Sequence, residues 1–251
     1  MGCTRQQLNA FFDDLLTPQR FKDYCPNGLQ VEGKGDVRHL VTGVTASQAL
    51  IEAARDRGAD AILVHHGYFW RSEPPCITGM KAARIRALVK ADINLFAYHL
   101  PLDCHPQHGN NASLGRLMGI EAPEALDPED PGTPVFRGQL EGSVTVQGLA
   151  ERLSIALDRS PLVIGGGDVK SVAWCTGAGQ GYIDLAADAG ADVYVTGEVS
   201  EQTAHVALER GIAFIGAGHH ATERYGVQAV GSLAAEALGL SHEFIDIDNP
   251  A

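Results

Sequence analysis

The stretch HLVTGVTASQALIEAARDRGADAILVHHG, residues 39–67, decides the fold of this chain. It starts with an apolar run typical of a buried strand, continues through an alanine-rich amphipathic pattern, and ends in a second apolar run. Short strands separated by helical patterns of about 10 to 15 residues indicate a layered α/β sheet. The stretch therefore predicts a β-α-β unit whose second strand ends at His65 and His66.

A second stretch, SVAWCTGAGQGYIDLAADAGADVYVTGEV at residues 171–199, has the same order of features. Both contain a strand ending in Thr-Gly, an alanine-rich helix, and Gly-Ala-Asp at the start of a second strand. The spacing from Thr-Gly to Asp differs by two residues, which fits a difference within one loop. We therefore predict an internal duplication that yields two similar three-layer α/β domains.

The third predicted strand of each half ends near a histidine that is followed four positions later by a carboxylate. These pairs are His99 with Asp103 and His219 with Glu223. The segment between the halves, residues 121–138, holds four prolines, two glycines and five acidic residues, a composition typical of a boundary loop. The expected domains are residues 1–125 and 126–251, with residues 216–226 returning to a site in the cleft between the domains.

Composition excludes several classes of function. The 19 basic and 31 acidic residues give a net charge of −12, and the cations are scattered, which argues against nucleic acid or an anionic membrane as a partner. Five cysteines without C-x-x-C spacing indicate reduced thiols rather than disulfides or a thiolate zinc site. No apolar run reaches the ~18 residues of a membrane span. We expect a cytoplasmic protein.

The candidate donors all follow apolar strands, and in open α/β sheets ligands bind at the carboxyl ends of strands. Imidazoles and carboxylates together suit a first-row divalent metal, and five donors from both halves match two metals better than one. Two such metals, about 3.5 to 4 Å apart, typically activate water for hydrolysis. Taken singly, each side chain is also explained by a helix cap or a hydrogen-bonded ring. The set comprises His65, His66, Asp103, His219 and Glu223.

Seven motifs resemble the Nif-three-like family, also called the GTP cyclohydrolase I type 2 family, and most closely its short bacterial YbgI-like members. They span nearly the whole chain. The motifs are NGLQVEG (27–33), VTGVTAS (41–47), GADAILVHHGYFW (58–70), YHLPLD (98–103), GNNASLG (109–115), TGEVSEQ (196–202) and GHHATERYG (218–226).

The resemblance implies a two-domain α/β subunit, a dinuclear metal site between the domains, and a toroidal homohexamer with the sites facing its interior. It places the metal ligands on the same five residues, His65, His66, Asp103, His219 and Glu223. Two divalent ions per subunit are expected, and the sequence does not distinguish Fe, Zn, Mn, Ni or Co.

Four further residues have two interpretations each. His99 is either a proton shuttle or outer donor beside the metals or a structural ring, and His220 is an outer or substrate-facing candidate. Tyr68 belongs either to a substrate wall or to packing. Glu198 either faces the cleft or is a surface carboxylate.

The leading function is a metal-dependent hydrolase that uses metal-activated water on a polar C–N or ester centre. The family name suggests ring-opening hydrolysis of a purine nucleotide such as GTP, although no residue identifies a guanine pocket, so the small-molecule substrate is unknown. The rival is a non-enzymatic metal-binding ring that acts as a scaffold, metal store or regulator. A third alternative, a nucleic-acid clamp, is opposed by the net charge of −12.

Overall fold

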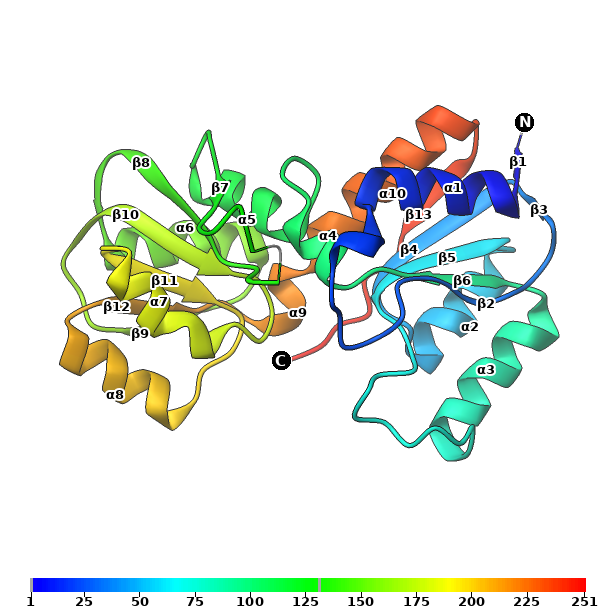
Figure 1. Ribbon diagram of the computed structural model, residues 1–251, viewed down its shortest axis with the longest axis horizontal. Coiled ribbons are helices and arrows are strands. Elements are labelled where there is room, and N and C mark those ends of the chain that lie inside the picture. The colour runs from blue at the N-terminus through cyan, green and yellow to red at the C-terminus, as the bar shows by residue number, and fades with distance from the viewer. Residues whose placement is uncertain (1, 131) are drawn as a thin grey trace. The chain divides into compact units, whose positions relative to one another are not determined.

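The structure is a computed structural model that describes residues 2–130 and 132–251; residue 131, in the expected boundary loop, lies outside the described residues. The chain divides into two compact units (Figure 1). Each unit has its own sheet and its own core. The first unit comprises Met1–Leu102 and Gly226–Asp248, and the second comprises Asp103–Tyr225 and Asn249–Ala251.

This division differs from the expected single boundary after residue 125. Strand β13 (Ser241–Phe244) belongs to the first unit because it pairs in parallel with β4 (His39–Thr45). Helix α5 (Asn110–Met118) belongs to the second unit, where Trp174 Nε1 donates to the Asn111 carbonyl at 2.9 Å. Long-range pairing and packing, which a proline-rich loop does not reveal, therefore set the division.

The described strands of the first unit include a five-stranded sheet in the order β13-β4-β5-β6-β2. Strands β13, β4, β5 and β6 run parallel, and β2 is antiparallel to β6. The elements are β1 (Cys3–Thr4), α1 (Arg5–Leu16), η1 (Pro18–Arg20), β2 (Gly28–Val31), β3 (Asp36–Val37), β4, α2 (Gln48–Asp56), β5 (Ala61–His66), α3 (Gly79–Ala91), β6 (Asn94–Ala97) and β13. Helices α4 (Leu100–Cys104) and α10 (Arg224–Leu238) begin in one unit and end in the other.

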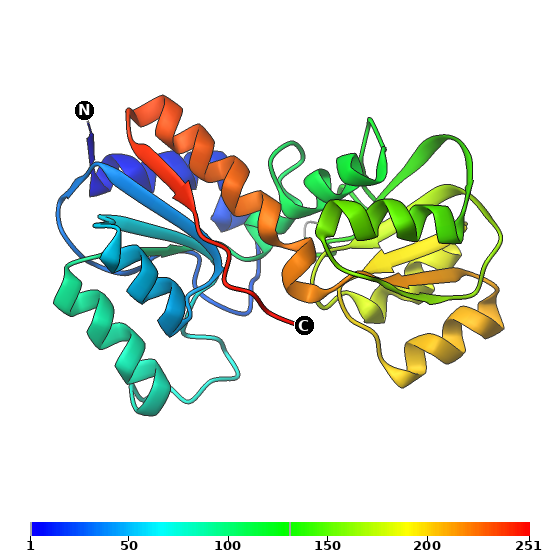
Figure 2. The ribbon, with the colours of Figure 1, turned by 180° about the vertical axis from the view of Figure 1, so that it is seen from behind.

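Helices cover both faces of this sheet, with α1 and α10 on one face and α2 and α3 on the other (Figures 1 and 2). The alternation of side chains along β5 matches this arrangement. Ala61 and Leu63 pack with α1 and α10, whereas Ile62 and Val64 pack with α2 and α3. Because the middle of β5 is apolar on both faces, its polar side chains are confined to its end.

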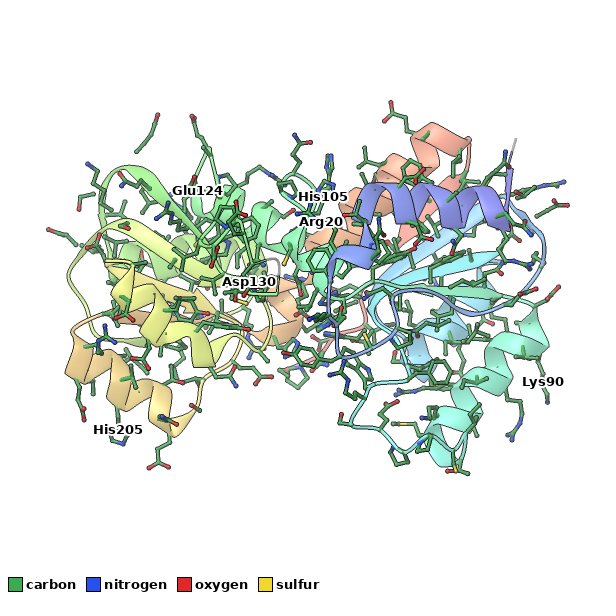
Figure 3. All side chains as sticks on the ribbon, in the orientation of Figure 1. Arg20, Lys90, His105, Glu124, Asp130 and His205 are labelled. Atoms are coloured by element: carbon green, nitrogen blue, oxygen red, sulfur yellow. The ribbon has the colours of Figure 1, made fainter. Side chains whose placement is uncertain are left out.

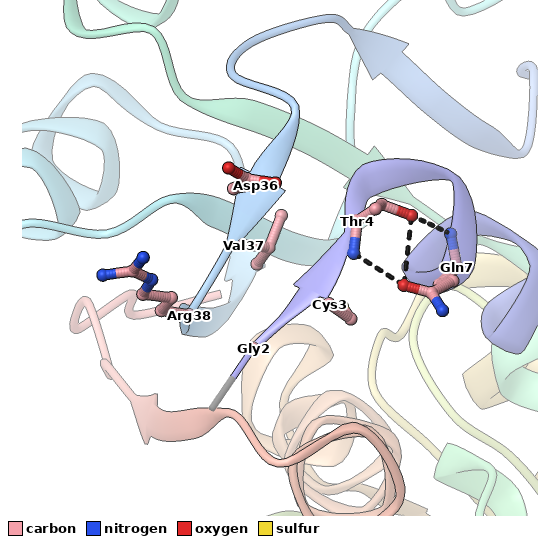
Figure 4. A pocket seen from close by; sticks show the side chains of 7 residues that line it. All are labelled: Gly2, Cys3, Thr4, Gln7, Asp36, Val37 and Arg38. Carbon is pink, nitrogen blue, oxygen red and sulfur yellow. Dashed lines mark hydrogen bonds between the residues drawn. The ribbon is translucent and has the colours of Figure 1, made fainter.

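Helix α1 begins at a reciprocal hydrogen-bonded cap. The Gln7 backbone N–H donates to Thr4 Oγ1 at 3.2 Å, and the Thr4 backbone N–H donates to Gln7 Oε1 at 2.8 Å (Figure 4). These bonds satisfy N–H groups that a helix start otherwise leaves unpaired. The same residues line a surface depression of about 490 Å³ together with Asp36, Val37 and Arg38.

The described strands of the second unit form a six-stranded sheet in the order β7-β8-β10-β11-β12-β9. Strands β10, β11 and β12 are parallel, and β8 and β9 flank them in antiparallel pairing. The elements are β7 (Glu124–Ala125), β8 (Phe136–Thr145), α5, α6 (Val146–Leu157), β9 (Leu162–Ile164), β10 (Asp168–Cys175), η2 (Gln180–Tyr182), α7 (Ile183–Asp188), β11 (Val193–Thr196), α8 (Glu201–Arg210), β12 (Ala213–Gly216) and α9 (His219–Thr222).

The second sheet is also buried on both faces. Val193 and Val195 of β11 pack with α5 and α6, and Tyr194 packs with α7 and α8. The chain is therefore a mixed α/β protein, as the sequence predicts. Within the described residues, no helix has both the length and the apolarity needed to span a membrane.

An aspartate at the start of one strand fixes the preceding strand in each unit. Asp60 Oδ2 accepts the backbone N–H groups of Arg38 and His39 at 2.7 and 2.9 Å. Asp192 Oδ2 accepts the backbone N–H groups of the two residues that occupy the corresponding place in β10, Lys170 and Ser171, at 2.9 and 2.8 Å. These Gly-Ala-Asp motifs therefore perform the same task in both units.

We expect Asp60→Asn to lower the free energy of unfolding by roughly 1 to 3 kcal/mol at neutral pH, because it removes charge-assisted hydrogen bonds. Burial alone would raise the pKa of Asp60, but hydrogen bonds from Lys34 and from the backbone N–H groups of Arg38 and His39 lower it. A lowered folded-state pKa stabilises the fold above the unfolded-state pKa, which is about 3.9, and this stabilisation disappears as the pH falls through the folded-state value.

The difference between the wild type and Asp60→Asn should therefore shrink below about pH 4, as measured by urea unfolding at several pH values. Asp56→Asn is the control, since Asp56 is exposed and pairs with its neighbour Arg55. It should change stability by less than about 0.5 kcal/mol. An Asp60→Asn effect that stays constant from pH 7 to pH 3 would contradict this role of the carboxylate.

Candidate metal centre

Three histidine rings gather at the carboxyl ends of β5 and β6 in the first unit. His65 and His66 end β5, and His99 follows β6. The ring centroids are 4.5 Å apart for His65 and His66, 5.1 Å for His65 and His99, and 6.0 Å for His66 and His99. One ring nitrogen of each lies within 4.8 Å of the others, so the group could hold a metal ion.

Backbone and hydroxyl partners orient the first two rings. His65 Nδ1 lies 3.0 Å from the Tyr98 carbonyl oxygen. Because a carbonyl only accepts, Nδ1 carries the proton and Nε2 is the nitrogen able to bind a metal. His66 Nδ1 lies 3.2 Å from Thr45 Oγ1. Both contacts engage Nδ1 and so direct metal binding to Nε2.

A buried carboxylate orients the third ring, since His99 Nδ1 lies 2.7 Å from Asp23 Oδ1. Burial alone would raise the pKa of Asp23, but His99, Asn27 and the Tyr24 N–H lower it. Asp23 is therefore ionised and accepts a hydrogen bond from the His99 ring N–H. Sequence reasoning missed Asp23, because it lies 76 residues from His99 and no spacing pattern connects them. The other donors to Asp23 are Tyr24 N, Asn27 Nδ2 and Leu100 N, at 2.6 to 2.9 Å.

In the second unit, His219 lies between two carboxylates. Its Nδ1 is 2.7 Å from Glu198 Oε1, and its Nε2 is 3.2 Å from Glu223 Oε2. Burial alone would lower the pKa of His219, but Glu223 and Glu198 raise it to about 9. The surroundings of this ring therefore favour positive charge. Glu198, for which the sequence left two interpretations, is the partner of His219.

Asp103, at the end of α4, is held by the first turn of α5. Its Oδ1 accepts Asn110 Nδ2 at 2.9 Å and Thr176 Oγ1 at 3.1 Å. Asn111 Nδ2 donates to the Asp103 carbonyl at 3.2 Å. The GNNASLG motif contains both asparagines, but the sequence assigned them no role. Burial raises the pKa of the Cys175 thiol, and the negative charges of Asp103 and Glu223 raise it further. Both carboxylates therefore lie near the Cys175 side chain.

Two of the expected neighbours of the site are buried. Tyr68 is 3% exposed and packs in the core with α2, and its hydroxyl donates to the Ala46 carbonyl at 2.7 Å. Among the described residues, Trp70 and Tyr24 place aromatic rings beside the histidines, with centroids 4.9 and 6.3 Å from that of His99. His220 is buried in α9, and its backbone N–H donates to the Ala251 carbonyl at 3.2 Å. Tyr68 therefore belongs to packing rather than to a substrate wall.

Two glycines allow the backbone to approach His219 and Glu223 closely. A Cβ on Gly197 would lie 2.6 Å from both the Gly177 carbonyl oxygen and His219 Cα. Gly177 has a φ of +65°, and a Cβ there would collide with Glu223 Oε1. The Thr-Gly ends of β10 and β11 therefore leave the space that the histidine and the carboxylate occupy.

A family model described as Duf34/NIF3 (NGG1p interacting factor 3) matches residues 3–250. The chain belongs to the Duf34/NIF3 family. The resemblance stated from the motifs is thus confirmed. A Pseudomonas aeruginosa protein named GTP cyclohydrolase 1 type 2 homolog is 53% identical over 240 residues, covering 95% of both chains. A Haemophilus influenzae protein of the same name is 52% identical over 248 residues and covers 98% of both.

Solved structures of other proteins have the same fold. Protein ybgI, described as of unknown function, superposes with a TM-score of 0.93 at 49% identity, covering 99% of this chain and 100% of that one. Reduced HcgD from Methanocaldococcus jannaschii has a TM-score of 0.84 at 24% identity over 99% of this chain and 99% of that one. The second likeness concerns the fold alone.

We expect Gly197→Ala to destabilise the protein by roughly 1 to 3 kcal/mol, because the added methyl group meets backbone atoms that cannot move aside cheaply. Gly166→Ala is the matched control, since a Cβ on Gly166 has no neighbour within 4 Å among the described residues. Urea unfolding measures both. Equal midpoints for the two variants would show that the close approach at Gly197 has no energetic consequence.

Proposed function

We propose that the two units together bind a dinuclear metal centre, with His65 and His66 from the first unit and Asp103, His219 and Glu223 from the second. The observation that carries this proposal is that each unit holds a set of imidazole or carboxylate donors whose orientation is set by partners within the same unit. Support also comes from the sequence, because all five donors follow apolar strands.

The donor set fits divalent first-row metals. Imidazole nitrogens suit Zn, Fe, Ni and Co, and carboxylate oxygens add affinity for Mn and balance the positive charge of the ions. Glu198 Oε1 and Glu223 Oε2 lie 2.7 and 3.2 Å from the ring nitrogens of His219, and the negative charge of these two carboxylates favours a cation at this place.

We infer that the protein is a metal-dependent hydrolase. The bound ions would supply activated water and polarise the electrophilic centre of the substrate. The residues of the chain would orient the ligands: the Tyr98 carbonyl holds His65, Glu198 holds His219, and Asn110 with Thr176 holds Asp103. The relatives named GTP cyclohydrolase 1 type 2 homolog direct the substrate proposal to a purine nucleotide or a related cyclic C–N compound.

We also propose that the two units descend from an internal duplication. The strand order β4-β5-β6-β2 in the first unit parallels β10-β11-β12-β9 in the second, and in both cases the last strand is antiparallel. The matching hydrogen bonds of Asp60 and Asp192 support the same correspondence. A duplication explains why the donors follow comparable strands in both units.

A toroidal homohexamer completes the proposal, and large exposed apolar side chains support self-association. Ile155, Met80 and Leu208 are 85%, 67% and 65% exposed. Light scattering after size exclusion should give the mass of six chains of 26.6 kDa each. A monomeric mass at micromolar concentration would contradict the hexamer while leaving the metal proposal intact.

Replacing single donors should lower the metal content. We expect His65→Ala and Glu223→Ala each to reduce bound metal from roughly two ions per subunit, since each removes a ligand. His205→Ala and Glu209→Ala are the controls, because both residues are exposed on α8. Figure 3 shows the side chain of His205. Elemental analysis after gel filtration measures the change. Unchanged metal content in both donor variants would refute the shared centre.

Hydrolysis should depend on Asp103. We expect metal-loaded protein to turn over one of the substrates tested, which are nucleotides, pterins, phosphoesters and cyclic amides. Asp103→Asn should abolish this turnover, because asparagine has a similar shape to aspartate but lacks the negative charge that binds a metal. Product formation is followed by chromatography, and Glu209→Ala serves as the control. If the wild type and Asp103→Asn show equal turnover, the activity comes from a contaminant. That result would favour the alternative function, a non-enzymatic metal-binding scaffold or regulator.

A further inference from the structure

The same carboxylate–imidazole arrangement occurs in both units. His219 Nδ1 is 2.7 Å from Glu198 Oε1, and His99 Nδ1 is 2.7 Å from Asp23 Oδ1. A metal-binding histidine usually donates its other ring N–H to a carboxylate or a carbonyl, which fixes its tautomer and orientation. His99 therefore has the partner that is typical of a ligand, although neither its sequence position nor the family motif assigned it that role.

The His99 ring lies beside the rings of His65 and His66, with centroids 5.1 and 6.0 Å away. Since Nδ1 donates to the ionised Asp23, Nε2 carries the lone pair. One ring nitrogen of each histidine falls within 4.8 Å of the other two, and the His65 and His99 centroids are 5.1 Å apart. The first unit thus presents three imidazoles to one place.

We propose that His99 is a further metal ligand, which binds through Nε2 beside His65 and His66, and that Asp23 is the positioning residue that holds it. This inference rests on the proposed metal centre and deepens it, because it adds a third nitrogen donor from the first unit. Three imidazoles with one open position are a known donor set for a catalytic divalent ion. One ion is then held by the first unit without Glu223.

The structure also offers a competing donor group around the same ring, Asp23, Cys25 and His99. Two observations favour the three-histidine group. The Asp23 oxygens already accept four hydrogen bonds, from His99, Asn27 and the backbone N–H groups of Tyr24 and Leu100. Burial, with a contribution from Asp23, raises the pKa of the Cys25 thiol to about 12, which disfavours a thiolate ligand.

Cobalt-loaded full-length protein tests the proposal with two readouts other than activity. Competition with a chelator measures the affinity of each ion, and paramagnetic NMR counts the shifted, exchangeable N–H signals of metal-bound imidazoles. We expect His99→Ala and His99→Gln to lose one such signal and to weaken one ion by at least about 10-fold. Asp23→Asn should weaken the same ion by about 10- to 100-fold.

The matched controls are Cys25→Ser, which removes the competing donor, and Asp13→Asn, which alters another hydrogen-bonded carboxylate of the first unit. Asp13 accepts the Tyr98 hydroxyl at 2.6 Å. Both controls should keep cobalt affinity within about twofold of the wild type. Circular dichroism confirms that each variant is folded, and His99→Gln retains a side-chain N–H for Asp23 if His99→Ala unfolds.

Three outcomes overturn the inference. Unchanged affinity and an unchanged number of N–H signals in the folded His99 variants would show that His99 is not a ligand. A loss of cobalt in Cys25→Ser equal to that in His99→Gln would assign the ion to the competing group. If His65→Ala binds as much metal as the wild type, the proposed metal centre itself is refuted. If His65→Ala loses metal but His99→Gln does not, only the role of His99 is refuted.

Discussion

Burial of the central parallel strands on both faces is the constraint on which the rest of the structure depends. Strand β5 is covered by α1 and α10 on one side and by α2 and α3 on the other, so its residues from Ala61 to Val64 are all apolar and buried. Polar side chains inside such a layer would destabilise the fold, because the free energy lost when they leave water exceeds the free energy gained from their hydrogen bonds. They are therefore placed at the carboxyl end, where His65 and His66 stand, and the same argument applies to β10, β11 and β12.

Hydrogen bonds to Nδ1 orient the four imidazole rings that follow the strands. The partners differ in chemistry: a carbonyl for His65, a hydroxyl for His66, and carboxylates for His99 and His219. In each case Nδ1 is engaged, which selects Nε2 for metal binding. The carboxylates also favour positive charge, and the effect is visible in the raised pKa of His219. A metal centre built on these rings would be preorganised by hydrogen bonds within each unit.

Local patterns predicted much of this protein. Apolar periodicity identified the α/β class, and the Gly-Ala-Asp motif marked strand starts that Asp60 and Asp192 anchor. The distance from Thr-Gly to Asp differs by two residues between the halves, as the sequence shows, whereas the residues that donate to Asp60 and Asp192 lie 22 positions earlier in both units. Tyr68 could not be placed from sequence, because an aromatic residue after a strand can turn into the core or toward a ligand.

The sequence by itself determined the main strands, the helices between them, and the polar residues that follow the strands, because periodic burial and short motifs are local properties of the chain. Only the tertiary structure decided that Asp23 holds His99, that Asn110 and Thr176 hold Asp103, and that α10 and β13 complete the first unit. Those interactions join residues far apart in sequence. A hydrogen bond between distant segments forms only after both are packed, so it leaves no periodic signal from which it could have been predicted.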